Sequence, residues 1–392
     1  MRMKLIKHQM FAALFGAAAL MTAHGQGFDN GSNGSLGALT LTDSDVTIDL
    51  PPDGRLNYTT VTIPSGRFLN FRRNALNTPV ILLAQGDVVI DGVIDVSGSQ
   101  APGSPPIGGF GGPGGFDGGK PGFGDDTPPG DGYGPGAGGA GQESGDVTGA
   151  GSGTYSSVSG SGSSTSKGGT YGSPLLIPLI GGSGGGGTFG SPGNGGGGGG
   201  GAILISSNTK IRISGNARVD ANGGGNRGSS LNAGSGGAIR LLAPRVEGTG
   251  ALRAFGGGGG GDGRIRVDCL DKTGLQFSFQ SSTTVGANMF VQPPALPRLD
   301  FIDAAGQAIA LDIANPVHVQ LPFGSSSART LTLRAKDFGA DTPIRVTLTP
   351  DAGPRIVIDT NIVNTAAANP ATLTIPVSVP ANTLVTINAW TR

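Results

Sequence analysis

One short apolar pattern recurs along the chain, and it restricts the possible folds more than any other feature. Residues 80–84, 202–206 and 238–242 are strand-like and apolar, and a second strand-like segment follows each of them after a short interval. These second segments are residues 92–98, 215–221 and 250–254, and a half-copy at 263–267 ends the series. Glycine runs lead into the last three copies, whereas Thr78 and Pro79 precede the first.

This repeat predicts an all-β, parallel β-solenoid over residues 26–292. Each copy holds two or three short strands joined by turns that are too short to contain a helix. A single copy cannot bury its Ile, Val and Leu side chains, but stacked copies pair each strand with its equivalent and bury a continuous apolar column. A set of β-hairpins in an ordinary sandwich is the alternative arrangement.

A glycine-rich insertion, residues 101–200, separates the first copy from the second. It holds more than half of the 76 glycines in the chain of 392 residues. Because the entropy of loop closure rises slowly with length, one turn of a solenoid can carry such an excursion. The insertion is either a disordered tether or a set of extended polyglycine strands that hydrogen-bond laterally. The apolar run 175–180 favours partial order, and the two interpretations stay open.

The last hundred residues, 293–392, have the pattern of a separate module. Six segments alternate apolar and polar residues with a period of two, and Asp, Gly and Pro residues separate them. This predicts a β-sandwich that resembles immunoglobulin-like modules but has no cysteine pair. Pro293, Pro294 and Pro297 form the expected linker, and Trp390 is expected to be a core or rim aromatic.

Residues 1–25 predict a secretory signal peptide. Arg2, Lys4 and Lys7 precede an apolar run at 10–23, and small residues lead to a cleavage position near Gly25. The run is too short to span a membrane, and no second run of that kind follows. We therefore expect a secreted or cell-surface protein without a transmembrane segment in the mature chain. Cys269 is the only cysteine, so no internal disulfide is expected.

The coupling of glycine runs to Ala-Ile strands resembles a group of uncharacterised, secreted bacterial glycine-rich proteins. The similarity lies in residues 179–187, 195–205 and 236–241, and it covers about residues 80–268. It implies a β-helix-like secreted body. It implies no activity and no catalytic residues.

Residue types suited to catalysis or metal binding are few. His318 is the only histidine of the mature chain and is expected to point outward, so neither a Ser-His-Asp triad nor a His/Cys zinc site is expected. Asp262 follows a glycine run as in calcium-binding β-rolls, but Arg264 stands where that motif needs an aliphatic residue. The formal net charge of zero gives no electrostatic basis for nucleic-acid binding.

Carboxylates carry the one enzymatic hypothesis. Polysaccharide lyases and hydrolases need acids gathered on one face, and the strands offer Asp91, Asp95, Asp220 and Asp268. The alignment of the copies makes Asp95 equivalent to Arg218 and Arg253, which favours a solubilising ladder of opposite charges. The insertion offers weak calcium ligands, although a solvated loop is the simpler interpretation; these acids are Asp117, Asp125, Asp126 and Asp131.

The sequence therefore predicts a secreted or cell-surface structural or adhesive protein without catalytic, cofactor-binding or metal-binding residues. Its expected partners are surface glycans or components of the cell envelope or matrix. The alternative is a carbohydrate-active β-helix enzyme, of the polysaccharide lyase or hydrolase type, with carboxylates on a solenoid face. A third hypothesis is a cargo protein whose sandwich docks it to an export or envelope partner.

Overall fold

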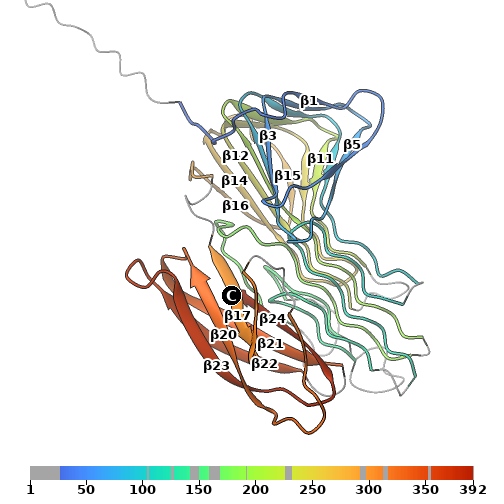
Figure 1. The fold of residues 1–392 in the computed structure, drawn as a ribbon. Helices are drawn as coiled ribbons and strands as arrows, with labels where there is room; N and C mark the ends of the chain where they lie inside the picture. The colour runs from blue at the N-terminus through green and yellow to red at the C-terminus, as the bar shows by residue number, and fades with distance from the viewer. Residues whose placement is uncertain are drawn as a thin grey trace, which may run out of the picture.

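Every regular element that the structure describes is a β-strand, which confirms the all-β prediction (Figure 1). The computed structural model describes residues 27–103, 106–124, 128–141, 150–158, 168–190, 192–225, 232–291, 297–311, 317–351 and 355–391. The predicted signal peptide lies outside these residues. No helix within them is long and apolar enough to cross a membrane.

Strands β1–β16 form two parallel sheets, which we call together the parallel body. The first sheet holds β1, β3, β4, β6, β7, β9, β10, β12, β14 and β16, and the second holds β2, β5, β8, β11, β13 and β15. Their bounds are β1 Leu39–Thr40, β2 Val46–Asp49, β3 Arg55–Tyr58, β4 Val61–Ile63, β5 Phe68–Arg72, β6 Val80–Ala84, β7 Val88–Ile90, β8 Val93–Asp95, β9 Ala202–Ser207, β10 Lys210–Ile213, β11 Arg218–Asp220, β12 Ala238–Gly248, β13 Ala251–Arg253, β14 Arg264–Asp271, β15 Ser278–Gln280 and β16 Ser282–Gly286.

Strands of successive copies pair in parallel, as the repeat predicts, although the register of the first copy differs by one residue from the repeat's alignment. Val80 pairs with Ile203, Ile203 with Ile239, and Ile239 with Ile265. The second sheet follows the same rule in the order β15-β13-β11-β8-β5-β2. The inward side chains of both sheets form one apolar core that runs through all copies, because each parallel pairing places like residues side by side.

Extended glycine-rich segments leave the parallel body between the second sheet and the next strand of the first (Figure 1). These excursions follow β8, β11 and β13, and the first contains the predicted insertion. We call the extended segments between residues 96 and 263 the glycine bundle. Their described parts hydrogen-bond laterally through the backbone, so the ordered interpretation of the insertion holds for them.

The segment 196–201 shows how the bundle is built. Its amides donate to three neighbouring segments with a period of three residues, as a helix with three residues per turn requires. The amides of Gly196 and Gly199 donate to the carbonyls of residues 119 and 116. Those of Gly197 and Gly200 donate to the carbonyls of residues 232 and 235. Those of Gly198 and Gly201 donate to the carbonyls of residues 99 and 96. Its carbonyls accept from three further segments, at residues 109–112, 182–185 and 224. This one segment therefore has six hydrogen-bonded neighbours.

Only glycine fits at these positions. A Cβ on Gly199 would lie less than 3.0 Å from the carbonyl oxygen of Gly182, and one on Gly196 equally close to that of Gly185. Real Cβ atoms do not approach backbone atoms so closely. The glycine runs are therefore a requirement of lateral packing.

The apolar run 175–180 anchors the bundle to the first sheet. Leu176 is buried beside Ala202 and Ala238, the first residues of β9 and β12. Tyr155 and Tyr171 stack in the same cluster with ring centroids 4.5 Å apart, and their hydroxyls donate to the carbonyls of Ile180 and Gly181. Burial raises the pKa of both tyrosines.

Residues 298–391 form two antiparallel sheets around a second apolar core, and we call this part the antiparallel unit. The sequence pattern did not predict β17 or β18. The first sheet has the order β18-β17-β20-β23 and the second β19-β24-β21-β22. The bounds are β17 Arg298–Ala304, β18 Gln307–Ala308, β19 Val317–Gln320, β20 Ala328–Lys336, β21 Ala340–Pro350, β22 Ile356–Asn364, β23 Ala371–Ser378 and β24 Leu384–Thr391.

The antiparallel unit packs on the glycine bundle, to which it presents β21 and β24 (Figure 1). Trp390 of β24 meets Phe116 edge to face with ring centroids 6.0 Å apart. Arg345 of β21 donates to the carbonyl of Pro135 at 3.3 Å. Trp390 thus joins two parts of the molecule. Two ion pairs add to this contact, Arg355 with Asp131 at 3.2 Å and Lys120 with Asp351 at 3.6 Å.

The bundle geometry predicts a sharp difference between two Gly→Ala variants. We expect Gly199→Ala to lower the free energy of unfolding by about 3 kcal/mol or more, because the methyl group cannot be accommodated against backbone. Gly225→Ala is the matched control, since a Cβ there meets no atom within 4 Å, and we expect a change within about 0.5 kcal/mol. Urea denaturation of both variants measures the difference. Equal stability of the two would contradict the packing described above.

Candidate functional site

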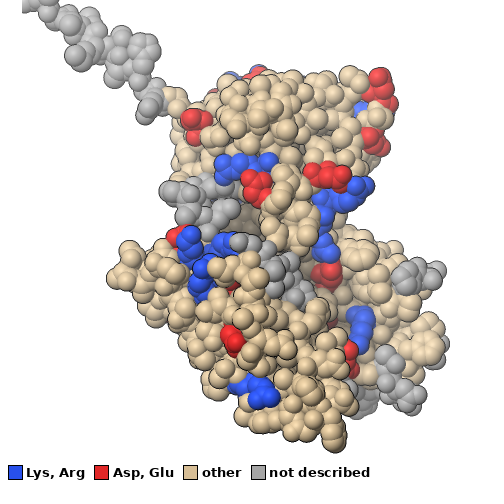
Figure 2. Space-filling model, in the orientation of Figure 1, with Lys and Arg blue, Asp and Glu red and all other residues tan. Residues whose placement is uncertain are grey.

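Charged side chains on the outer surface of the parallel body lie mostly in opposite pairs. Lys210 bonds Asp87 at 3.3 Å, and Arg212 bonds Asp91 at 3.2 Å. Figure 2 shows several adjacent blue and red groups on one face of the molecule. These pairs confirm the ladder of opposite charges for Asp91.

Asp95 follows that ladder only in part: its expected equivalence with Arg253 is confirmed, and its expected equivalence with Arg218 was wrong. The strand register pairs Asp95 of β8 with Asp220 of β11, and Asp220 with Arg253 of β13. Arg218 pairs with Val93 instead. The alignment of the second copy was off by two residues, so Asp95 and Asp220 stand side by side on neighbouring strands, whose backbones lie about 4.8 Å apart.

Asp220 is the most unusual carboxylate of this face. Its side chain is 9% exposed, and Arg218 Nε donates to its Oδ2 at 2.7 Å. Its Oδ1 is buried without a hydrogen-bond partner, and Arg253 Nε lies 3.9 Å from it. Burial raises the pKa of Asp220, and the charge of Asp95 adds to the rise, whereas Arg218 and Arg253 oppose it.

An exposed aromatic ring completes this face. Phe68 of β5 is 36% exposed, and the guanidinium carbon of Arg218 lies 5.8 Å from its ring centroid. Asn70 pairs with Asp95 on the next strand. We call Phe68, Asp95, Arg218, Asp220 and Arg253 the ladder site. It combines a flat apolar ring, two carboxylates and two guanidinium groups, which is a set that can contact a polyhydroxylated chain.

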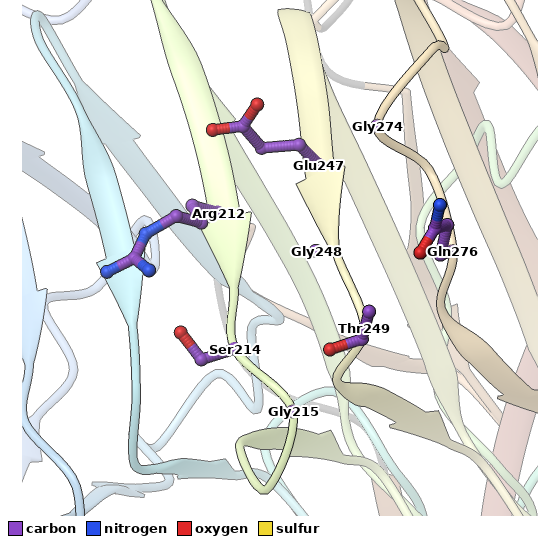
Figure 3. Close-up of a pocket in the computed structure, with 8 residues that line it drawn as sticks. All are labelled: Arg212, Ser214, Gly215, Glu247, Gly248, Thr249, Gly274 and Gln276. Atoms are coloured by element: carbon purple, nitrogen blue, oxygen red, sulfur yellow. The ribbon is translucent and has the colours of Figure 1, made fainter.

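A shallow pocket of about 390 Å³ lies at the turns that lead into β11, β13 and β15 (Figure 3). Arg212 points away from its centre toward β7, because it is paired with Asp91. Glu247 accepts from Arg245 Nε at 2.6 Å. The remaining lining is neutral and consists of Ser214, Gly215, Gly248, Thr249, Gly274 and Gln276. Hydroxyl and amide groups could bind sugar hydroxyls here, but both charged groups already have partners.

Asp268 is not on a solvent face, contrary to its place among the surface candidates. Its side chain is 0% exposed and bonds Arg240 at 3.4 Å, Arg266, and the amide of Asn288 at 2.9 Å. Arg240 also donates to the carbonyls of Asn288, Phe290 and Val291. This cluster fastens residues 288–291 to the sheet, so its role is structural.

The acids of the insertion are structural as well. Asp117 accepts two hydrogen bonds from Arg73, at 2.6 and 3.1 Å, and Asp131 pairs with Arg355. The expected solvated loop was therefore wrong for these two acids. Asp125 and Asp126 lie outside the described residues.

The remaining candidates are not brought together. His318 is exposed on β19 as predicted, with Thr386 Oγ1 3.3 Å from its Nδ1. Cys269 is a free, buried cysteine of the core, and burial raises the pKa of its thiol. Asp262 contacts Ser156 and Ser157 through its backbone. Within the described part of the chain, no group of three or more His, Cys, Asp or Glu side chains could hold a metal ion.

Comparison of the chain with protein-family profiles, with curated proteins and with solved structures gives no match.

The environment of Asp220 predicts its titration. The pKa of Asp220 is higher in the folded chain than in the unfolded chain. As the pH rises, the unfolded chain therefore loses this proton at a lower pH than the folded chain does. Between the two pKa values, the contribution of Asp220 to the free energy of unfolding falls as the pH rises. Carboxyl-carbon NMR is expected to place its pKa above the ordinary value of about 3.9. Asp271 serves as the internal control, because hydrogen bonds from Thr273 lower its pKa. A value for Asp220 at or below that of Asp271 would show that the carboxylate is not desolvated.

Proposed function

We propose that this chain is a secreted or cell-surface structural protein with an adhesive face and no catalytic activity. In this proposal the parallel body is a β-solenoid and the antiparallel unit an immunoglobulin-like β-sandwich. The expected partners are surface glycans or cell-envelope or matrix components. The basic and apolar segments of residues 1–25 support export.

The observation that carries the proposal is that backbone hydrogen bonds and side-chain contacts connect all three parts. The glycine bundle continues directly into β9, β12 and β14, and one of its segments has six hydrogen-bonded neighbours. The antiparallel unit is attached to the same bundle by an aromatic contact, a hydrogen bond and two ion pairs. Such a body keeps its surfaces at fixed distances, as a structural or adhesive protein requires.

The ladder site is the adhesive face that this proposal favours. An exposed ring stacks on the apolar face of a sugar, while carboxylates and guanidinium groups bond its hydroxyls or its acidic groups. Parallel pairing places these groups in two columns across neighbouring strands, one with Phe68 and Arg218 and one with Asp95, Asp220 and Arg253, which suits an extended ligand.

Cell fractionation and a polysaccharide panel test the proposal together. We expect producing cells to hold the protein in the envelope or matrix fraction with Gln26 at its N-terminus, and the purified protein to bind at least one neutral or anionic polysaccharide. Phe68→Ala is expected to weaken that binding about fivefold, because the ring and its contact with the Arg218 guanidinium are lost.

Phe323→Ala is the matched control, since Phe323 is the most exposed phenylalanine of the antiparallel unit, at 89%. Its binding is expected to equal that of the unaltered protein. A protein confined to the cytoplasm, or one that binds no envelope or matrix preparation, would contradict the proposal.

A carbohydrate-active enzyme is the second candidate, and one observation favours it. The register places Asp95 beside Asp220, and burial raises the pKa of Asp220. Glycoside hydrolysis uses such a pair, in which one acid donates a proton while the other acts as a base or nucleophile.

Turnover on the same polysaccharide panel decides between the two candidates. An enzyme of this type is expected to lose activity about a thousandfold or more in Asp95→Asn or Asp220→Asn, because each acid carries a separate step. Asp271→Asn, an acid on the other sheet, is the control. Binding without turnover supports the structural proposal and removes the enzymatic one.

A further inference from the structure

Both ends of the parallel body are open. Within the described residues, β2 pairs only with β5 at the N-terminal end, and β15 pairs only with β13 at the C-terminal end. Likewise β16 pairs only with β14. Such edge strands offer a row of backbone donors and acceptors to another strand.

The apolar column is uncovered at the same two ends. Val46 and Ile48 of β2 face the core but are only partly buried, and so is Phe279 of β15. Val285 of β16 continues an inward column and is 42% exposed. Their equivalents in the inner copies are completely buried, as Leu252 shows. Solenoid ends of this kind need a cap or a neighbour.

The two edges of the second sheet match in register. Pairings from strand to strand place Phe279 level with Val46, through Leu252, Val219, Ile94 and Leu69. A copy stacked in the same direction would therefore put Phe279 beside Val46, and both side chains face the core. On the outer face Gln280 would lie beside Thr47 and Ser278 beside Asp45, so no like charges meet.

The two edges of the first sheet are also complementary, because one edge ends in an extra strand and the other lacks a strand at the same level. The last turn of the body holds only β16 after β15, whereas the first turn begins late, at Leu36 and β1. The pairings place Thr284 level with Arg55, so β16 ends level with Asn57. Leu36 starts its pairing with β3 at that level, where its amide donates to the carbonyl of Asn57. The first turn therefore has no strand beside the first half of β3, and β16 of the last turn has the register to fill that position.

We propose that the C-terminal end of the parallel body binds the N-terminal end of a second copy of this chain. In this contact β15 pairs with β2 and β16 with the first half of β3, all in parallel. Because the two surfaces differ, the contact is heterologous and continues into filaments. This inference rests on the proposed structural function and adds self-association to it.

Charge variants at the outward pair Thr47 and Gln280 test the contact. Thr47 is exposed and Gln280 partly so, and the two meet only across the junction. We expect the purified protein to form concentration-dependent linear oligomers in multi-angle light scattering and electron microscopy. The double variant Thr47→Lys with Gln280→Lys places like charges at every junction, and Thr47→Glu with Gln280→Lys places opposite charges there. The assembly constants of these two variants are expected to differ about tenfold in favour of opposite charges.

Thr330→Lys, at an exposed strand position of the antiparallel unit, is the control and is expected to assemble like the unaltered protein. Thermal unfolding of each variant shows whether the fold is kept. A protein that stays monomeric at every concentration, or equal assembly of the two charge variants, overturns the inference. A monomer that still binds polysaccharide leaves the proposed function standing, whereas filaments without polysaccharide binding support self-association and argue against the adhesive face.

Discussion

The lateral backbone hydrogen bonds of the glycine bundle are the constraint on which the rest of the structure depends. An extended helix with three residues per turn has no internal hydrogen bonds, so every amide and carbonyl must find a partner on another segment. Segment 196–201 meets this demand with six neighbours. Glycine loses more backbone entropy on ordering than any other residue, and the absence of a Cβ is what lets the neighbours approach closely enough to offset that loss.

The parallel body determines the spacing of the segments in the glycine bundle. Three turns of the body enter the bundle after a strand of the second sheet, namely β8, β11 and β13, and return to the next strand of the first. Successive excursions are therefore held at the spacing of neighbouring strands, which brings their glycine segments alongside one another. The buried cluster of Arg240, Asp268 and Arg266 acts at the far end of the body, where it holds residues 288–291 before the chain enters the antiparallel unit. Buried charges of this kind need several hydrogen bonds to be tolerated, and the backbone carbonyls of this segment supply them.

Local patterns predicted the strands well and the long-range contacts poorly. The repeat was sufficient to predict that β6, β9, β12 and β14 pair in parallel, because stacking the copies buries their inward apolar side chains in one column. The state of the insertion could not be decided, since its amides bond partners that lie far away in the sequence, such as Gly197 and Asn232. Trp390 was expected at a core or rim, but its ring meets Phe116, and nothing in the local sequence of either residue points to the other.

The candidate site shows how much depends on register in a stacked fold. Similarity between copies made Asp95 equivalent to Arg253, which the register confirms, and to Arg218, which is wrong. Glycine and apolar residues dominate the alignment and leave that shift of two residues undetected. A shift of two keeps the same side chains on the same face, so the apolar pattern could not reveal the error. The backbone pairing instead sets Asp95 beside Asp220, and a ladder of opposite charges becomes a pair of carboxylates with arginines at its margin. Burial of Asp220, with the charge of Asp95 beside it, then raises the pKa of Asp220.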